Sequence, residues 1–170
     1  KYVYQPTMDA MAAEGRPFVG ILFTGLMLTE DGPKVLEYNA RFGDPEAEVI
    51  LPRLQSDFVE VIETVMDHKS CTLSWSDDVT LGVVLASGGY PASSTKGALI
   101  RGLDQVDAQI YHMGTALKEE GLVTDGGRVL IVVSKEKTLE QAYAKAYEEV
   151  KKIDCDCLFY RNDIGKKDMN

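Results

Sequence analysis

The sequence predicts an α+β fold, and three observations support this expectation. Residues 18–29 are apolar and contain two glycines, which is typical of a buried strand. Several short strand patterns follow in the second half, before one amphipathic helix pattern at residues 138–152. With 170 residues and 45% hydrophobic content, the chain is long enough to bury a core, as one large domain or two small ones.

The first part of the chain is expected to begin with a helix over residues 7–14 that ends at Gly15. The run at residues 18–29 then predicts a long, mostly buried strand. A turn at residues 30–33 returns the chain into a second strand at residues 34–38. The two strands should form an antiparallel hairpin.

Two helices are expected after this hairpin. Asp44 followed by Pro45 fits an N-cap and a first helical position, with the helix running over residues 46–54. Ser56 is expected to cap the next helix. The apolar positions of that helix fall on one face: Phe58, Val61, Ile62, Val65 and Met66.

The polar stretch at residues 68–78 is interpreted as the connection to a second part. Strands are expected there at residues 79–86, 97–101, 109–112, 122–124, 128–134 and 158–160. The strands at residues 122–124 and 128–134, on either side of Asp125-Gly126-Gly127, should pair as a hairpin. Thr138 and Gln141 form a capping-box pattern that starts the final helix.

Composition excludes several classes of protein. The net charge is −9, with 27 acidic and 18 scattered basic residues, which argues against a nucleic-acid partner. No apolar run approaches the roughly 20 residues that cross a bilayer, so a soluble, cytoplasmic protein without a membrane partner is expected. The three cysteines suggest no disulfide framework, and Cys155 and Cys157 are interpreted as ordinary thiols near a strand.

The candidate chemistry lies at the end of the strand at residues 34–38. Glu37 and Asn39 are two residues apart, so their side chains should project from the same face and offer hard oxygen ligands to Mg²⁺. Arg41 follows, and its planar fork suits a carboxylate or a phosphate. Gly43 permits close approach of backbone to a ligand, and the helix start beyond it suits an anion. A Glu-x-Asn pattern at a strand end is common, so spacing alone leaves a purely structural explanation open.

The run VLEYNARFGDPE at residues 35–46 resembles the metal-binding strand and loop of the glycinamide ribonucleotide synthetase family, within the ATP-grasp superfamily. Further motifs of that family follow the same order along nearly the whole chain: QPTMDAMAAEG at 5–15, ASGGYP at 86–91, GT at 114–115, VTDGGRVL at 123–130 and YRNDIG at 160–165. The resemblance implies the C-terminal lobe of an ATP-grasp fold, an antiparallel sheet with helices, over residues 1–70. A small mixed α/β C-terminal domain would follow over residues 71–170.

The resemblance also implies an activity and roles for residues. The family ligates glycine to 5-phosphoribosylamine in purine biosynthesis, converts ATP to ADP and phosphate, and passes through a glycyl phosphate. Glu37 and Asn39 match its Mg²⁺ (or Mn²⁺) ligands. Arg41 would be catalytic and would bind the glycine carboxylate or the acyl phosphate. Gly43 and Asp44 would complete the substrate-binding set, although Asp44 would mainly build the loop.

The family's glycine-rich loop, ATP-binding lysines and N-terminal domain lie upstream of the matched portion, so the chain is expected to be a fragment that is inactive alone. Two alternatives stay open at this point. One is another ATP-grasp carboxylate–amine ligase, and the other is a non-catalytic binding or assembly module, with other purine-synthesis domains in the same polypeptide.

Overall fold

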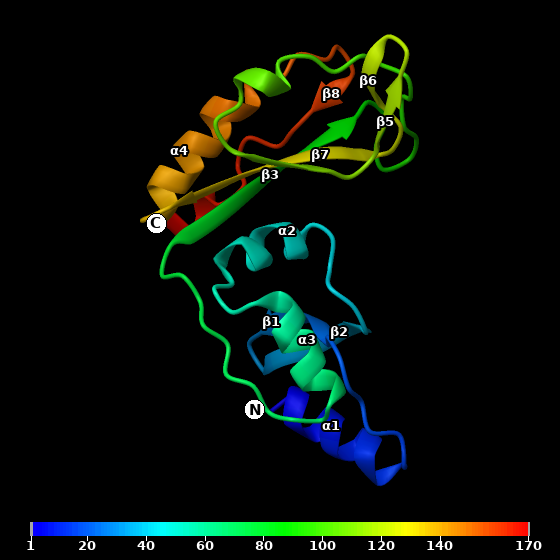
Figure 1. The fold of residues 1–170 in the computed structure, drawn as a ribbon, viewed down its shortest axis with the longest axis vertical. Helices are drawn as coiled ribbons and strands as arrows, with labels where there is room; N and C mark the ends of the chain where they lie inside the picture. Colours follow the sequence, from blue (N-terminus) through cyan, green and yellow to red (C-terminus); the bar gives the residue numbers. More distant parts are fainter. Residues whose placement is uncertain (1, 170) are drawn as a thin grey trace. The chain divides into compact units, whose positions relative to one another are not determined.

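The computed structural model describes residues 2–169 and contains helices and antiparallel sheets, which confirms the α+β expectation (Figure 1). The chain forms two compact units. Unit 1 extends to Asp44 and includes Leu54–Trp75, whereas unit 2 comprises Pro45–Arg53 and the residues from Ser76 onward. The units therefore interleave in sequence, and the division into domains 1–70 and 71–170 stays a prediction.

Unit 1 is built on a two-stranded antiparallel ribbon of β1 (Phe23–Thr29) and β2 (Gly32–Asn39). The predicted hairpin is confirmed, with a shorter turn and a longer second strand than expected. The predicted long buried strand is wrong, because β1 begins only at Phe23 and Leu28 is 81% exposed. In a ribbon of two strands, neither strand has neighbours on both sides, so much of its surface stays open.

The ribbon contains one irregularity. Gly25 lies opposite Glu37, but the next residue, Leu26, lies opposite Val35. Leu36 is therefore an extra residue on β2, as in a β-bulge. The bulge shifts the partner of every later residue on β2 by one position.

Two helices accompany the ribbon in unit 1. Helix α1 (Tyr4–Ala13) ends as predicted, because Gly15 takes the left-handed conformation, with a φ of 73°, beyond the last turn. Helix α3 (Phe58–Met66) is capped by Asp57, whose carboxylate accepts from the backbone N–H groups of the first turn at 2.8 and 3.0 Å. The predicted Ser56 cap is wrong, since the Ser56 hydroxyl instead accepts from the Ser74 N–H at 2.8 Å.

Unit 2 has a four-stranded antiparallel sheet in the order β4-β7-β3-β8. The strands are β3 (Val79–Ser87), β4 (Gln109–His112), β7 (Arg128–Glu136) and β8 (Leu158–Phe159). A separate two-stranded ribbon pairs β5 (Thr115–Lys118) with β6 (Gly121–Thr124). Helix α4 (Leu139–Val150) lies along the sheet in Figure 1 and packs against β3 and β7.

The core of unit 2 lies between this helix and the sheet. Buried side chains come from alternate positions of β3, from β7 and from one face of α4: Leu81, Val83, Leu85, Val129, Leu130, Val132, Ala142, Ala146, Tyr147 and Val150. The Ser134 hydroxyl, only 1% exposed, donates to the Ala142 carbonyl at 2.6 Å and so joins strand to helix. Thr138 caps α4 as predicted and accepts from the Gln141 N–H.

Two strand predictions in unit 2 are wrong. Residues 122–124 and 128–134 do not form a hairpin, because β6 pairs with β5 while β7 lies between β3 and β4. Gly126, in the segment between them, lies close to the backbone of Gly114. A Cβ at Gly114 would come within 2.8 Å of the Gly126 Cα, so the two chain segments approach this closely because the residue is a glycine. Residues 97–101 make only isolated bridges, Leu99 with Val123 and Arg101 with Asp154.

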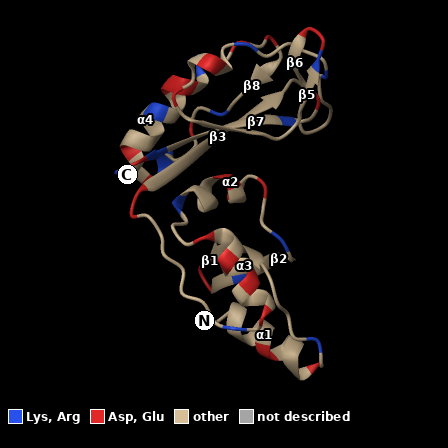
Figure 2. Cartoon of the chain, viewed as in Figure 1, with Lys and Arg blue, Asp and Glu red and all other residues tan. Residues whose placement is uncertain are grey.

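Charges are mixed over the surface, and Figure 2 shows acidic residues on α3 and interspersed acidic and basic residues on α4. Within residues 2–169, no helix combines the length and apolar content needed to cross a membrane.

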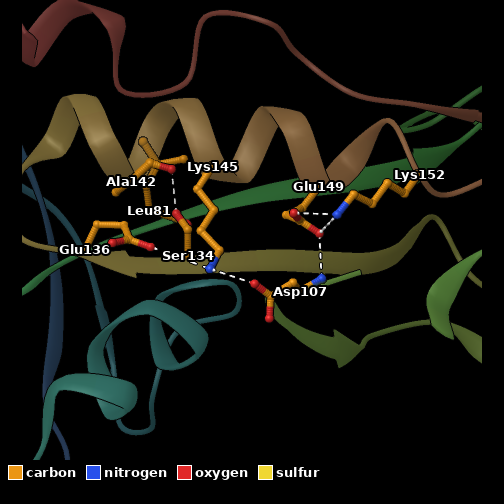
Figure 3. Close-up of polar contacts among 8 residues, drawn as sticks. All are labelled: Leu81, Asp107, Ser134, Glu136, Ala142, Lys145, Glu149 and Lys152. Carbon is orange, nitrogen blue, oxygen red and sulfur yellow. Dashed lines mark hydrogen bonds and ion pairs between the residues drawn. The ribbon is translucent and has the colours of Figure 1, made fainter. Parts of the chain in front are cut away.

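A buried carboxylate ties α4 to the segment before β4 (Figure 3). Glu149 is 4% exposed and accepts from the Asp107 N–H at 2.6 Å and from the Lys152 ammonium at 2.7 Å. The Lys152 ammonium lowers the pKa of Glu149, and burial opposes this effect. One turn earlier on the same face of the helix, the Lys145 Nζ atom lies 3.3 Å from an Asp107 carboxylate oxygen and 3.7 Å from a Glu136 carboxylate oxygen.

We expect Glu149→Ala to lower the free energy of unfolding of unit 2 by about 1–3 kcal/mol, because the Asp107 N–H loses its buried acceptor. The measurement is urea unfolding followed by far-ultraviolet circular dichroism. Glu148→Ala, at the exposed neighbouring position, is the matched control and should change stability by less than about 0.5 kcal/mol.

The same carboxylate predicts a pH dependence. Its pKa is lower in the folded state than the usual 4.5, so the unfolded state binds the proton more tightly. The stability difference between the wild type and Glu149→Gln should be complete above about pH 4.5 and shrink as the pH falls below it. A difference that grows on acidification would contradict this assignment.

Candidate functional site

The candidate metal ligands lie at the carboxyl end of β2. The Asn39 side-chain amide donates to the Glu37 Oε1 atom at 3.1 Å. The structure therefore brings the two side chains together, as their spacing predicts. Glu37 is exposed and Asn39 is half-buried, so both remain within reach of a ligand.

The residue between them holds the strand end in place. The Tyr38 hydroxyl lies 2.8 Å from the Thr7 hydroxyl of α1, which is a hydrogen-bond distance. Side chains of adjacent strand residues point to opposite faces. Tyr38 therefore anchors β2 on α1 while its two neighbours remain available on the other face.

Gly25 is a positioning residue that the sequence did not reveal. It lies opposite Glu37 across the ribbon, and a Cβ at this position would come 3.1 Å from the Glu37 Cγ atom. Such a contact is tighter than about nine in ten of those that real Cβ atoms make, so the Glu37 side chain would have to shift by a few tenths of an ångström. The absent side chain therefore gives Glu37 the space in which it meets Asn39.

The loop after β2 carries the other predicted site residues. Arg41 is exposed and donates through Nη1 to the Phe42 carbonyl at 2.8 Å. The Phe42 ring packs against Phe58 of α3, with centroids 6.0 Å apart and planes tilted by 54°. Gly43 is buried and Asp44 is exposed. The Phe42 contact thus anchors the loop, and Arg41 stays exposed with one N–H on the loop backbone.

The helix that follows this loop starts differently from the prediction. Helix α2 (Glu46–Ile50) is followed by a 3₁₀ turn at Leu51–Arg53, and its N-cap is Pro45 without a side-chain cap bond. The predicted Asp44 cap is therefore wrong. The ψ of 23° at Pro45 lies outside the helical range, which delays the helix by one residue. Five residues supply little macrodipole, so this helix adds little to an anion site.

The donor set suits a hard divalent cation. Glu37 and Asn39 offer carboxylate and amide oxygens, which Mg²⁺ and Mn²⁺ accept, and an octahedral ion completes its shell with water and phosphate oxygens. Among residues 2–169 no group of three or more His, Cys, Asp or Glu side chains could hold a metal.

Unit 2 has a separate concave region of about 380 Å³ on the sheet. Its walls are mainly apolar and aromatic, and two arginines reach it: Pro45, Gly82, Val84, Ala86, Tyr90, Arg128, Phe159, Tyr160, Arg161 and Ile164. Arg161 makes a bidentate pair with Asp163 at 2.8 and 2.9 Å. Gly127 accommodates the Tyr90 ring, since a Cβ there would lie 2.5 Å from it.

Comparison with known families gives two matches. The family described as "Phosphoribosylglycinamide synthetase, C domain" matches residues 80–167. The family described as "Phosphoribosylglycinamide synthetase, ATP-grasp (A) domain" matches residues 1–47, which include every predicted site residue.

Individual proteins agree with these matches. The phosphoribosylamine–glycine ligase of Halalkalibacterium halodurans is 54% identical over 164 residues, covering 95% of this chain and 38% of the relative. The ligase of the same name from Brucella melitensis is 47% identical, covering 95% of this chain and 39% of the relative. The crystal structure of the Thermotoga maritima phosphoribosylamine–glycine ligase superposes with a TM-score of 0.82 at 36% identity, over 92% of this chain and 39% of that one. The chain thus spans about two fifths of the length of these relatives.

The role of Gly25 predicts a local effect of substitution. We expect Gly25→Val to displace the Glu37 side chain and break its hydrogen bond with Asn39. The measurement is the nuclear magnetic resonance shift of the Asn39 side-chain amide. Met27→Val, at an exposed position of the same strand, is the control and should leave that shift in place. An unchanged Asn39 signal in Gly25→Val would show that Gly25 does not position the Glu37 side chain.

Proposed function

Because the chain belongs to the phosphoribosylglycinamide synthetase family, we propose that it is the metal- and carboxylate-binding part of a phosphoribosylamine–glycine ligase. The complete ligase would join glycine to 5-phosphoribosylamine in the cytoplasm and convert ATP to ADP and phosphate. The observation that carries the proposal is the Glu37–Asn39 pair at the end of β2, with Arg41 two residues further on.

In the first step, a glycine carboxylate oxygen takes the γ-phosphoryl group of ATP, which gives glycyl phosphate and ADP. In the second step, the amine of phosphoribosylamine attacks the glycyl carbonyl, and phosphate leaves with the electron pair of the C–O bond. Both steps move negative charge among phosphate oxygens. Catalysis therefore depends on groups that position and neutralise that charge.

Glu37 and Asn39 would hold the divalent ion, Mg²⁺ or Mn²⁺. When bound, this ion supplies charge neutralisation at the ATP phosphates. The hydrogen bond from Asn39 to Glu37 would hold the two ligands together before any ion binds, while Gly25 leaves room for Glu37 and the Tyr38–Thr7 contact fixes the strand end. A pre-arranged pair loses less conformational entropy on binding than two free side chains would.

Arg41 would bind the glycine carboxylate, and then the acyl phosphate formed from it. Only one of its N–H groups is directed at the Phe42 carbonyl, so the guanidinium has further donors for an anion. Gly43 would pack against this ligand, and Asp44 would lie beside it at the end of the loop. The Phe42–Phe58 contact would limit the movement of Arg41.

We expect Glu37→Ala in the complete ligase to lower kcat by roughly a hundredfold or more, because several kcal/mol of charge stabilisation depend on the ion. Steady-state assays over a range of Mg²⁺ concentrations would measure this loss. Glu30→Ala, in the exposed turn of the same ribbon, is the matched control and should retain normal activity. Near-normal kcat for Glu37→Ala at ordinary Mg²⁺ would contradict the metal assignment.

We also expect the 170-residue chain alone to form no glycinamide ribonucleotide. It spans about two fifths of the length of its relatives. The resemblance implies that the phosphate-covering loop and ATP-binding lysines of the family lie upstream of the matched portion. The assay supplies ATP, Mg²⁺, glycine and phosphoribosylamine, with the complete ligase at equal concentration as the positive control. Clear turnover by the chain would show that the matched portion is sufficient.

A further inference from the structure

Two cysteines lie side by side in the turn before β8. The Sγ atoms of Cys155 and Cys157 are 3.7 Å apart. The turn is closed by a hydrogen bond from the Leu158 N–H to the Cys155 carbonyl at 3.1 Å. This turn brings two thiols into contact that belong to neither the proposed metal site nor the arginine loop.

Small reagents can reach this pair. Cys155 lines a surface pocket of about 220 Å³ together with Leu99, Arg101, Asp154 and others. Both thiols are half-buried. Burial raises the pKa of Cys155, and contact with the Cys157 sulfur also raises it.

The surroundings of the turn are held more firmly than its tip. Asp154 and Arg101 exchange two backbone hydrogen bonds, of 2.9 and 3.0 Å. On the other side, the Cys157 carbonyl accepts from the Gly88 N–H at 2.8 Å. Asp156, between the two cysteines, is exposed. A disulfide requires the sulfurs to approach to about 2.05 Å, which is a movement of roughly 1.7 Å from their present separation.

A structural metal is the competing use of two adjacent thiols. Thiolates around a tetrahedral zinc ion, with bonds of about 2.3 Å, lie nearly as far apart as these sulfurs. Such a site needs four ligands, however, and within residues 2–169 no cluster of three or more candidate ligands includes this pair. The arrangement therefore favours covalent pairing of the two sulfurs.

We propose that Cys155 and Cys157 form a modification site, a reversible dithiol–disulfide pair that reacts with small disulfides such as oxidised glutathione. One cysteine thiolate attacks the small disulfide, forms a mixed disulfide and releases one glutathione thiolate. The second cysteine loses its proton to solvent, attacks the mixed disulfide and releases the second glutathione. Two protein thiols are oxidised, and one glutathione disulfide is reduced to two thiols.

The pair is linked to the glycine turn at Gly88 through the Cys157 carbonyl. Any backbone movement of Cys157 on oxidation would change this hydrogen bond or carry Gly88 with it. Tyr90, in the same turn, lines the concave region of unit 2. Oxidation should therefore be detected at the Gly88 amide.

The test uses the 170-residue chain carrying Cys71→Ser, which removes the exposed third thiol. The protein is treated with oxidised glutathione, denatured, alkylated and weighed by mass spectrometry. We expect the loss of two hydrogens, no bound glutathione, no alkylation, and full reversal by a reducing agent. Two alkylated cysteines, or one glutathione on each cysteine, would overturn the proposal.

Two further variants sharpen the result. Cys155→Ser and Cys157→Ser, each in the Cys71→Ser background, should stop at a stable mixed disulfide with one glutathione, because the second thiol is missing. Hydrogen exchange at the Gly88 amide should change on oxidation of the parent and remain unchanged in both serine variants. An unchanged Gly88 amide in the oxidised parent would overturn the link to the glycine turn.

Discussion

The antiparallel pairing of β3 with β7 is the interaction on which unit 2 depends. It runs from Val79 opposite Glu136 to Ala86 opposite Arg128. The edge strands β4 and β8 attach to its two sides, and α4 covers its buried face. Since five consecutive apolar residues of β7 are almost completely buried, Val129 to Val133, any shift of register would move packed side chains out of contact.

Unit 1 depends on a different constraint, the register of a small ribbon. Within its described residues only Thr24 and Gly43 are buried, so packing alone specifies little. The bulge at Leu36 sets Gly25 opposite Glu37, and the hydroxyl contact between Tyr38 and Thr7 holds the end of β2. The geometry of the candidate site thus comes from backbone pairing and one cross-element contact. Such a site gains stability when a ligand binds to it.

The proposed metal site and the cysteine pair differ in how the surrounding structure supports them. Glu37 is exposed and Asn39 is half-buried, and both lie on a ribbon with little buried surface that leaves room for Glu37 at Gly25. The Cys155–Cys157 turn is tied on both sides to the well-packed unit 2, through Arg101 and Gly88. A change at the first would act on ligand binding directly. A change at the second would act on the arrangement of a glycine turn.

The sequence by itself determined the fold class, the helix at α4 with its Thr138 cap, the hairpin of unit 1 and the convergence of Glu37 with Asn39. These depend on local periodicity and on neighbours close in the chain. The tertiary structure alone decided the position of β7 between β3 and β4, the bulge at Leu36 and the 3.7 Å contact of the two cysteines. Without the bulge, regular pairing from the turn would set Gly25 opposite Leu36. Pairing partners and register depend on long-range packing and on single extra residues, which leave no periodic signal in the sequence.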